Sequence, residues 1–545
     1  MANRKLKLLV VWGLLLVLLL LGVYSFGDIK YSSKEGLSYG EKKRDAKYLM
    51  DFLEDTYPYF EELKAITGQD FLKERTKIIN SISKTSSDAE FINTLYDFFR
   101  KFIFGAVGVT LDIPPNSNSY NYLDENLGIT ERTFNEKLYE GKLKWEPIEK
   151  EYWDKLFNAS YACNLNANYI DGEYYISMSQ DPEVHAGDLV IAVDGVDVHE
   201  YVKTLPYDRS FSYYDFLNEK NVMGYLFTPF GKTPNEITIK NSANEEKKIK
   251  LLSFDPNKPI LEDGFRVYAN DPKVEVSEVP KVNLINPTQD GNILALNFSA
   301  FEEVNKYFGD SRETEKLYSY INNSNYLILD FRNGFNDVLF NRMIEYISPK
   351  DIEYFDYKVI KKNEINDKYI EYLKGYPSAN TTEVTSSTET LEKVYPQSEY
   401  HILKEKRIGI KGNNKYKGKV FILVRNNFSS DDSNAALKAV VENNYATVIS
   451  DGQLPVYGYI PDESTISTIL PNSNLGITVQ NVKLVDSNGT FSREVFVTPQ
   501  ILIKKDKVQY ADNLRKGHGY GPEIPEGDRY TNKDEYYVEV LKLIK

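Results

Sequence analysis

Residues 420–451 read VFILVRNNFSSDDSNAALKAVVENNYATVISD, and this stretch decides the fold. Its first five residues are wholly apolar, which is typical of a strand buried on both faces of a sheet. Residues 430–442 have the spacing of a helix, and residues 446–449 form a second apolar run. A strand, a helix and a strand in this order predict two neighbouring parallel strands joined by a crossover helix.

The same alternation extends toward the N-terminus from this stretch. Residues 293–296 and 326–329 are short apolar runs, and the second ends at Asp330. Helical spacing occupies residues 314–321 and follows Asp330 to about residue 347. We therefore predict that residues 291–545 form an α/β core with a mainly parallel sheet and flanking helices.

Three further regions precede this core. Residues 28–125 have helical periodicity and are predicted to be an N-terminal helical region. Short β-type runs bounded by Gly, Asp and Asn predict a β-rich domain over residues 160–254. Prolines recur between residues 255 and 290, which predicts an extended linker.

The extreme N-terminus predicts a transmembrane helix within residues 1–27. Arg4, Lys5 and Lys7 precede residues 8–27, which are uncharged and mostly Leu or Val. About 20 apolar residues match the hydrocarbon thickness of a bilayer. Positive charge before the span keeps that end cytoplasmic, so we expect a single-pass protein of the cell membrane with an extracytoplasmic body. An uncleaved signal anchor and a cleaved signal peptide both remain open.

Composition excludes several classes of function. The net charge of −14 argues against a nucleic-acid partner, because phosphate binding relies on clustered Lys and Arg. Cys163 is the single cysteine, so no intrachain disulfide can form, and an exported chain of this kind suggests a bacterial cell envelope. We find no His, Cys and Asp spacing typical of a metal site and no phosphate loop, so we expect no metal and no cofactor.

Four segments, in order, resemble the tail-specific (C-terminal-processing) serine protease family, which is related to the tricorn protease core. AGDLVIAVDG, residues 186–195, is similar to the family's PDZ domain. LILDFRNG, residues 327–334, is similar to the strand before its oxyanion turn. Residues 420–451 resemble the strand, nucleophile, helix and strand, and FVTPQ, residues 496–500, resembles a late proline motif. The resemblance implies a serine peptidase fold with a PDZ-like domain over residues 160–254 and Ser429 as the catalytic nucleophile.

The residues that should activate this serine depart from the family's pattern. A serine hydroxyl needs an adjacent base and donors for the oxyanion. Tail-specific members use a lysine in a segment that matches residues 451–458, which contain none. Tricorn-like members use a histidine in a turn that matches residues 105–108, which read GAVG. Only one glycine, Gly334, remains in the expected oxyanion turn over residues 333–337.

Ser429 also has a structural interpretation. In Ser429-Ser430-Asp431-Asp432, the first serine can cap the following helix with an acid three residues later. Asp432 stands where the family often has a glutamate and is a secondary catalytic candidate. His518 lies in a Gly-His-Gly context from which it could reach another domain, whereas His185 and His199 are expected at a surface.

We therefore predict a catalytically degenerate homologue of tail-specific proteases that binds peptides or protein C-termini. The first alternative is an active serine endopeptidase that uses Ser429 with an unidentified base. The second is an envelope structural or glycan-binding protein. The expected partners are peptide or protein termini and, through the N-terminal helix, a membrane.

Overall fold

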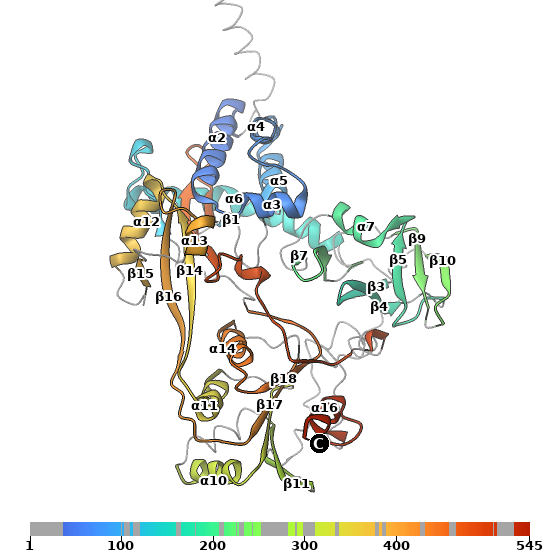
Figure 1. Ribbon diagram of the computed structural model, residues 1–545. Helices are drawn as coiled ribbons and strands as arrows, with labels where there is room; N and C mark the ends of the chain where they lie inside the picture. The colour runs from blue at the N-terminus through green and yellow to red at the C-terminus, as the bar shows by residue number, and fades with distance from the viewer. Residues whose placement is uncertain are drawn as a thin grey trace, which may run out of the picture.

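A computed structural model shows a helical layer, a β-rich unit and a central sheet with flanking helices (Figure 1). The structure describes residues 36–99, 101–102, 109–112, 120–159, 165–179, 181, 183–205, 212–224, 226–227, 234–241, 243–251, 282–288, 291–297, 311–332, 337–375, 381–383, 389–425, 431–456, 465–504, 506–508 and 528–544.

The helical layer stands at one end of the molecule (Figure 1). It contains α2 (Tyr39–Thr56), α3 (Phe60–Thr67), α4 (Arg75–Ser83), α5 (Asp88–Phe99) and the long α6 (Glu131–Ala159). Ser38 begins α2 with a capping box, because its hydroxyl accepts from Glu41 N while the Glu41 carboxylate accepts from Ser38 N. Near the start of α5, the Glu90 carboxylate accepts from Ser86 N at 2.6 Å, while Glu90 N donates to the Ser87 hydroxyl at 3.1 Å.

The central sheet has six described strands in the order β11-β12-β13-β17-β18-β24. Strands β12 to β24 run parallel, and only β11 pairs antiparallel with its neighbour. The bounds are β11 Val282–Thr288, β12 Gly291–Asn297, β13 Tyr326–Asp330, β17 Lys419–Val424, β18 Thr447–Ser450 and β24 Ile501–Leu502. Strand β11 lies within the stretch predicted as a linker.

Apolar residues cover both faces of this sheet, which explains why its strands are continuous hydrophobic runs. Leu329 and Ile422 pack on one face with residues of α11 (Asp337–Ile347) and α14 (Asp431–Glu442). Ile328 and Phe421 point to the other face and pack with residues of α16 (Glu535–Ile544). Helix α10 (Ser311–Asn322) connects β12 to β13. The predicted helix after Ser429 is thus present, and it begins at Asp431.

Two more sheets join the helical layer to the C-terminal half of the chain. One has the order β15-β16-β14-β22 and the other β1-β21-β20-β2. Their bounds are β15 Thr381–Glu383, β16 Tyr400–Ile410, β14 Ile352–Lys361, β22 Lys483–Val485, β1 Val109–Asp112, β21 Gly476–Gln480, β20 Thr465–Ile469 and β2 Tyr120–Asn121, with α12 (Glu364–Gly375) and α13 (Glu389–Val394) beside them. Lys361 Nζ donates to Glu54 O and Tyr57 O, both at 3.0 Å, and so binds the end of α2.

The β-rich unit has a hydrophobic cluster of its own, which includes Ala167, Tyr174 and Ile237. Its sheet has the order β10-β9-β5-β4-β3, with β6 beside β5. The bounds are β3 Leu165–Ile170, β4 Glu173–Ser179, β5 Leu189–Val193, β6 Val196–Asp197, β9 Glu236–Lys240 and β10 Glu246–Lys250, with α7 (Val198–Thr204) and the hairpin β7 (Ser212–Asp215)–β8 (Lys220–Met223).

Two predictions are wrong: the transmembrane helix in the fold class and the location as a single-pass protein of the cell membrane. Within the described ranges, no helix is both long and apolar enough to cross a bilayer. The longest of these helices, α2 and α6, carry charged residues along their whole length, which a hydrocarbon core would not tolerate. The segment predicted to cross the membrane, residues 8–27, lies outside the described residues. The structure has mixed helices and sheets, with parallel pairing in several places.

Candidate functional site

The carboxyl ends of β13, β17 and β18 meet at one edge of the central sheet. Asp330 is in register with Leu423, and Val424 with Ser450. Phe331 N continues this contact by donating to Leu423 O at 2.9 Å. Ligands and catalytic groups of open α/β sheets gather at such an edge, so this edge is the candidate site.

Ser429 belongs to the connection that leaves this edge. Strand β17 ends at Val424 and α14 begins at Asp431, so the connection starts and ends beside the sheet. Ser429 itself lies outside the described residues, as do residues 333–336 of the predicted oxyanion turn. Asp432 is the second residue of α14. The structure therefore describes the residues at the sheet edge that surround this connection, and we call them the frame of the site.

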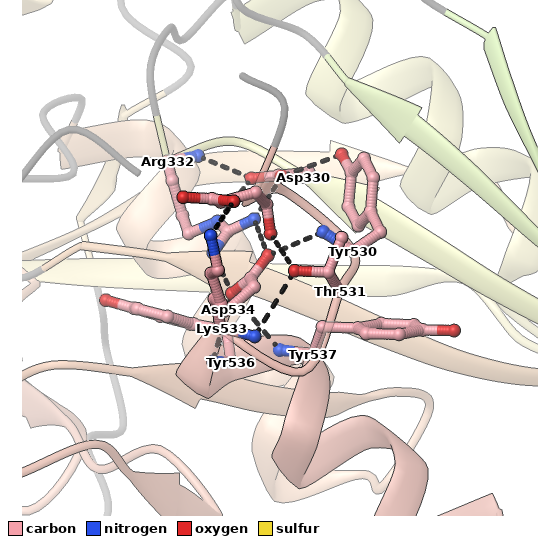
Figure 2. Close-up of polar contacts among 9 residues, drawn as sticks. Asp330, Arg332, Tyr530, Thr531, Lys533, Asp534, Tyr536 and Tyr537 are labelled. Atoms are coloured by element: carbon pink, nitrogen blue, oxygen red, sulfur yellow. Dashed lines mark hydrogen bonds and ion pairs between the residues drawn. The ribbon is translucent and has the colours of Figure 1, made fainter. Parts of the chain in front are cut away.

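Asp330 and Arg332 form the centre of that frame (Figure 2). Arg332 Nε donates to Asp330 Oδ1 at 2.9 Å and Nη2 donates to Oδ2 at 2.7 Å, while Arg332 N also donates to Oδ1 at 3.1 Å. The side chains are only 1% and 3% exposed, respectively. Two parallel hydrogen bonds between a guanidinium and a carboxylate fix both groups in one geometry.

Asp534, near the C-terminal end of the sequence, supplies a second carboxylate. Arg332 Nη1 donates to Asp534 Oδ1 at 2.7 Å, and Nη2 donates to Oδ2 at 3.0 Å. Asp534 lies immediately before α16, and its Oδ1 also accepts from Tyr536 N at 3.1 Å and Tyr537 N at 3.3 Å. One buried carboxylate thus caps α16 and binds the end of β13 at the same time.

Two tyrosines complete the frame. Tyr530 OH donates to Asp330 Oδ2 at 2.8 Å, and the Tyr536 ring lies 4.7 Å from the Arg332 guanidinium carbon. Burial, with the nearby Asp330 charge, raises the pKa of Tyr530 well above its usual value, so its phenol stays a donor. Burial alone would raise the pKa of Asp330, but the charge and hydrogen bonds of Arg332 lower it overall. We call Asp330, Arg332, Tyr530 and Asp534 the carboxylate clasp.

The segment that should supply a lysine is instead an apolar strand. Leu454–Pro455 is β19, which pairs antiparallel with β23 (Phe496–Val497), and Val456 N donates to Val495 O at 2.9 Å. Leu454 and Val456 are both 0% exposed. Asn434 of α14 donates to Pro455 O at 2.8 Å and so holds this strand against the helix that follows Ser429.

No lysine stands between Lys438 and Lys483 in the sequence, and both of these are engaged elsewhere. Lys438 Nζ pairs with Glu442 at 2.7 Å, one turn further along α14. Lys483 of β22 pairs with Glu62 of the helical layer. Neither side chain is directed to the carboxyl edge of the central sheet by these contacts.

The described histidines have partners outside the central sheet. His401 on β16 contacts Asp367 through Nε2 at 2.6 Å, and His199 on α7 contacts Lys220 at 3.0 Å. His185 precedes β5, and its backbone N–H donates to Asp188 at 2.8 Å. His518 and residues 105–108 lie outside the described residues. The described part of the chain holds no group of three or more His, Cys, Asp or Glu side chains that could bind a metal.

Sequence reasoning missed Tyr530 and Asp534. Tyr530 lies 200 positions from Asp330 along the chain, and Asp534 lies 202 positions from Arg332. The one local signal was Asp534-Glu535 before the run Tyr536-Tyr537-Val538, which is a pattern typical of a helix start.

Comparison with known proteins gives matches among solved structures only. No family model and no curated protein matches the chain. Mature CPAF complexed with lactacystin is similar at 12% identity and a TM-score of 0.41, over 93% of this chain and 98% of that one. The photosystem II D1 C-terminal processing protease is similar at 10% identity and a TM-score of 0.32, over 88% and 98%. A putative peptidase from Parabacteroides merdae follows at 13% identity and a TM-score of 0.27, over 52% and 69%. At low identity, the structural neighbours of this chain thus include a C-terminal processing protease.

Proposed function

We propose that this chain is a tail-specific-protease-like protein that has lost peptide hydrolysis and binds peptides or protein C-termini. One observation carries the loss of hydrolysis: the strand at the place of the family's lysine, Leu454–Pro455, is apolar, and Leu454 and the adjacent Val456 are fully buried. A lysine side chain at this place would be buried between β19 and β23, where burial of its ammonium would be costly.

The guanidinium at the centre of the described frame offers no replacement. Arg332 is bound by two carboxylates, and a guanidinium stays protonated at any working pH. It cannot accept a proton from a serine hydroxyl. Arg332 therefore serves the structural frame and does not replace the missing lysine.

Binding is proposed for the β-rich unit. Its sheet and α7 enclose a separate hydrophobic cluster, so the unit has a core that does not depend on the central sheet. Antiparallel units of this kind can accept an extended peptide as an additional strand and hold a terminal carboxylate with backbone amides. The four segments that resemble tail-specific proteases favour this mode over glycan binding.

The test is a titration of the full chain with an unstructured peptide and its C-terminally amidated twin. We expect the free carboxylate to bind at least about tenfold more tightly, which corresponds to one charge-assisted contact of roughly 1.4 kcal/mol. The Ser429→Ala variant serves as a matched control and should bind both peptides as the unmodified chain does. Equal affinities for the two peptides, or no binding across a broad peptide library, would contradict the proposal.

A further inference from the structure

A histidine and a lysine meet where α7 packs on the β7–β8 hairpin. Lys220, the first residue of β8, places its Nζ 3.0 Å from His199 Nε2. The same ammonium donates to Gly172 O at 2.8 Å. This position differs from the free surface expected for His199, because the ring is half-buried against Tyr174 at a centroid distance of 5.7 Å.

The contact defines the protonation state of the ring. A lysine ammonium has donors only, so His199 Nε2 must be the acceptor. The ring proton then lies on Nδ1, which is buried and has no hydrogen-bond partner among the described residues. His199 is therefore a neutral imidazole with one specific partner.

The surrounding charges oppose a second proton on this ring. Lys203, on α7, adds positive charge, although it also pairs with Glu200 at 2.6 Å. Asp197 and Glu173 act in the opposite direction. However, Asp197 accepts from the backbone N–H of His199 at 2.9 Å, and Glu173 is bound by Lys507 at 2.7 Å.

Protonation would thus place an imidazolium 3.0 Å from an ammonium, and neither nearby carboxylate bonds to the ring. Burial and the Lys220 charge accordingly lower the pKa of His199. The ring can charge readily only after it separates from Lys220.

The hairpin that carries Lys220 also touches the rest of the molecule. The Phe216 ring, directly after β7, lies 5.5 Å from that of Phe491 in a T-shaped contact. Asn221 Nδ2 donates to Ile66 O of α3 at 3.4 Å. The hairpin is therefore placed between α7 of the β-rich unit on one side and the helical layer on the other.

We propose that His199 and Lys220 form an acid-sensitive latch that holds α7 on the β7–β8 hairpin. Above about pH 6.5, the ordinary value for histidine, the neutral ring accepts from Lys220 and the latch is closed. As the pH falls below that value, the open form takes up a proton that the closed form resists, so the population shifts to the open form. The latch requires no peptide ligand, and it stands independently of the proposed function.

Hydrogen exchange of the α7 amides at pH 7.5 and pH 5.0, corrected for intrinsic rates, tests the latch in the full chain. We expect acid to increase the opening of α7 by up to about thirtyfold. The factor follows because each pH unit below the ordinary histidine pKa of about 6.5 multiplies the ratio of open to closed form by ten. His199→Gln keeps an acceptor for Lys220 and cannot take a proton, so it should abolish the acid effect. The control His185→Gln should keep it, and Lys220→Met should reduce it because the opposing cation is gone.

An equal acid response in the unmodified chain and in His199→Gln would overturn the proposal. If His199→Gln does not fold, the unmodified chain still decides the question through the titration of its histidine ring protons by NMR. The ring of His199 is identified as the one whose signal changes in Lys220→Met. The proposal requires the pKa of this ring to lie below about 6.5. Titration of that ring at or above this value would overturn it as well.

Discussion

The carboxylate clasp and the His199–Lys220 latch are two basic centres with opposite surroundings. Arg332 lies between two carboxylates and is 3% exposed, and its guanidinium donates four hydrogen bonds to them. His199 instead is a neutral ring that faces the Lys220 ammonium at 3.0 Å. The clasp joins opposite charges, whereas the latch joins a neutral ring to a cation and would join two like charges if the ring took up a proton.

The two centres respond to acid in different ranges. The folded-state pKa of Asp330 is lowered, so its contribution to stability is complete above the unfolded value of about 3.9 and is lost as the pH falls through the folded value. The latch weakens already below about pH 6.5, because its histidine has a lowered pKa in the folded state. At pH 5 we therefore expect the clasp to keep its contribution to stability, while the latch opens more often than at pH 7.5.

The largest expected effect comes from Arg332→Met. This change leaves Asp330 and Asp534 buried next to each other without a cation, and breaking such a pair typically costs about 3–5 kcal/mol. Denaturant unfolding should show this loss. Arg132→Met is the matched control, because Arg132 is 88% exposed and its pair with Glu136 is expected to contribute less than about 1 kcal/mol. Equal losses in the two variants would show that the clasp does not hold the sheet edge to α16.

Tyr530→Phe should have a smaller effect within the same centre. It removes the phenol that donates to Asp330 Oδ2 at 2.8 Å, while Arg332 Nη2 remains bound to that oxygen. A hydrogen bond to a charged group contributes about 1.5–3 kcal/mol, and the remaining partner favours the lower end of this range. Unfolding of Tyr139→Phe, at a 64% exposed position, provides the control and should be almost unchanged. A loss above that of Arg332→Met would reverse the order of importance within the clasp.

Local sequence patterns predicted the central sheet because its signals are local. The strands β13, β17 and β18 are apolar runs, and α14 follows its 3.6-residue spacing. The clasp joins residues 200 and 202 positions apart, and no local pattern reports such a pair. The same reason explains His199, whose half-buried state depends on Lys220, 21 residues later. β11 was missed because prolines recur through the residues before it, which is typical of an extended linker.

Labelling of Ser429 by a fluorophosphonate probe, combined with cleavage of unstructured protein, tests the central claim most directly. A missing general base typically costs about two to four orders of magnitude in rate. We predict no labelling of Ser429, and cleavage by the full chain no faster than by its Ser429→Ala variant. That variant should lose on the order of 1 kcal/mol of stability if the hydroxyl caps the helix that follows. Labelling of Ser429 together with cleavage that the alanine variant abolishes would contradict the account and identify an active serine peptidase.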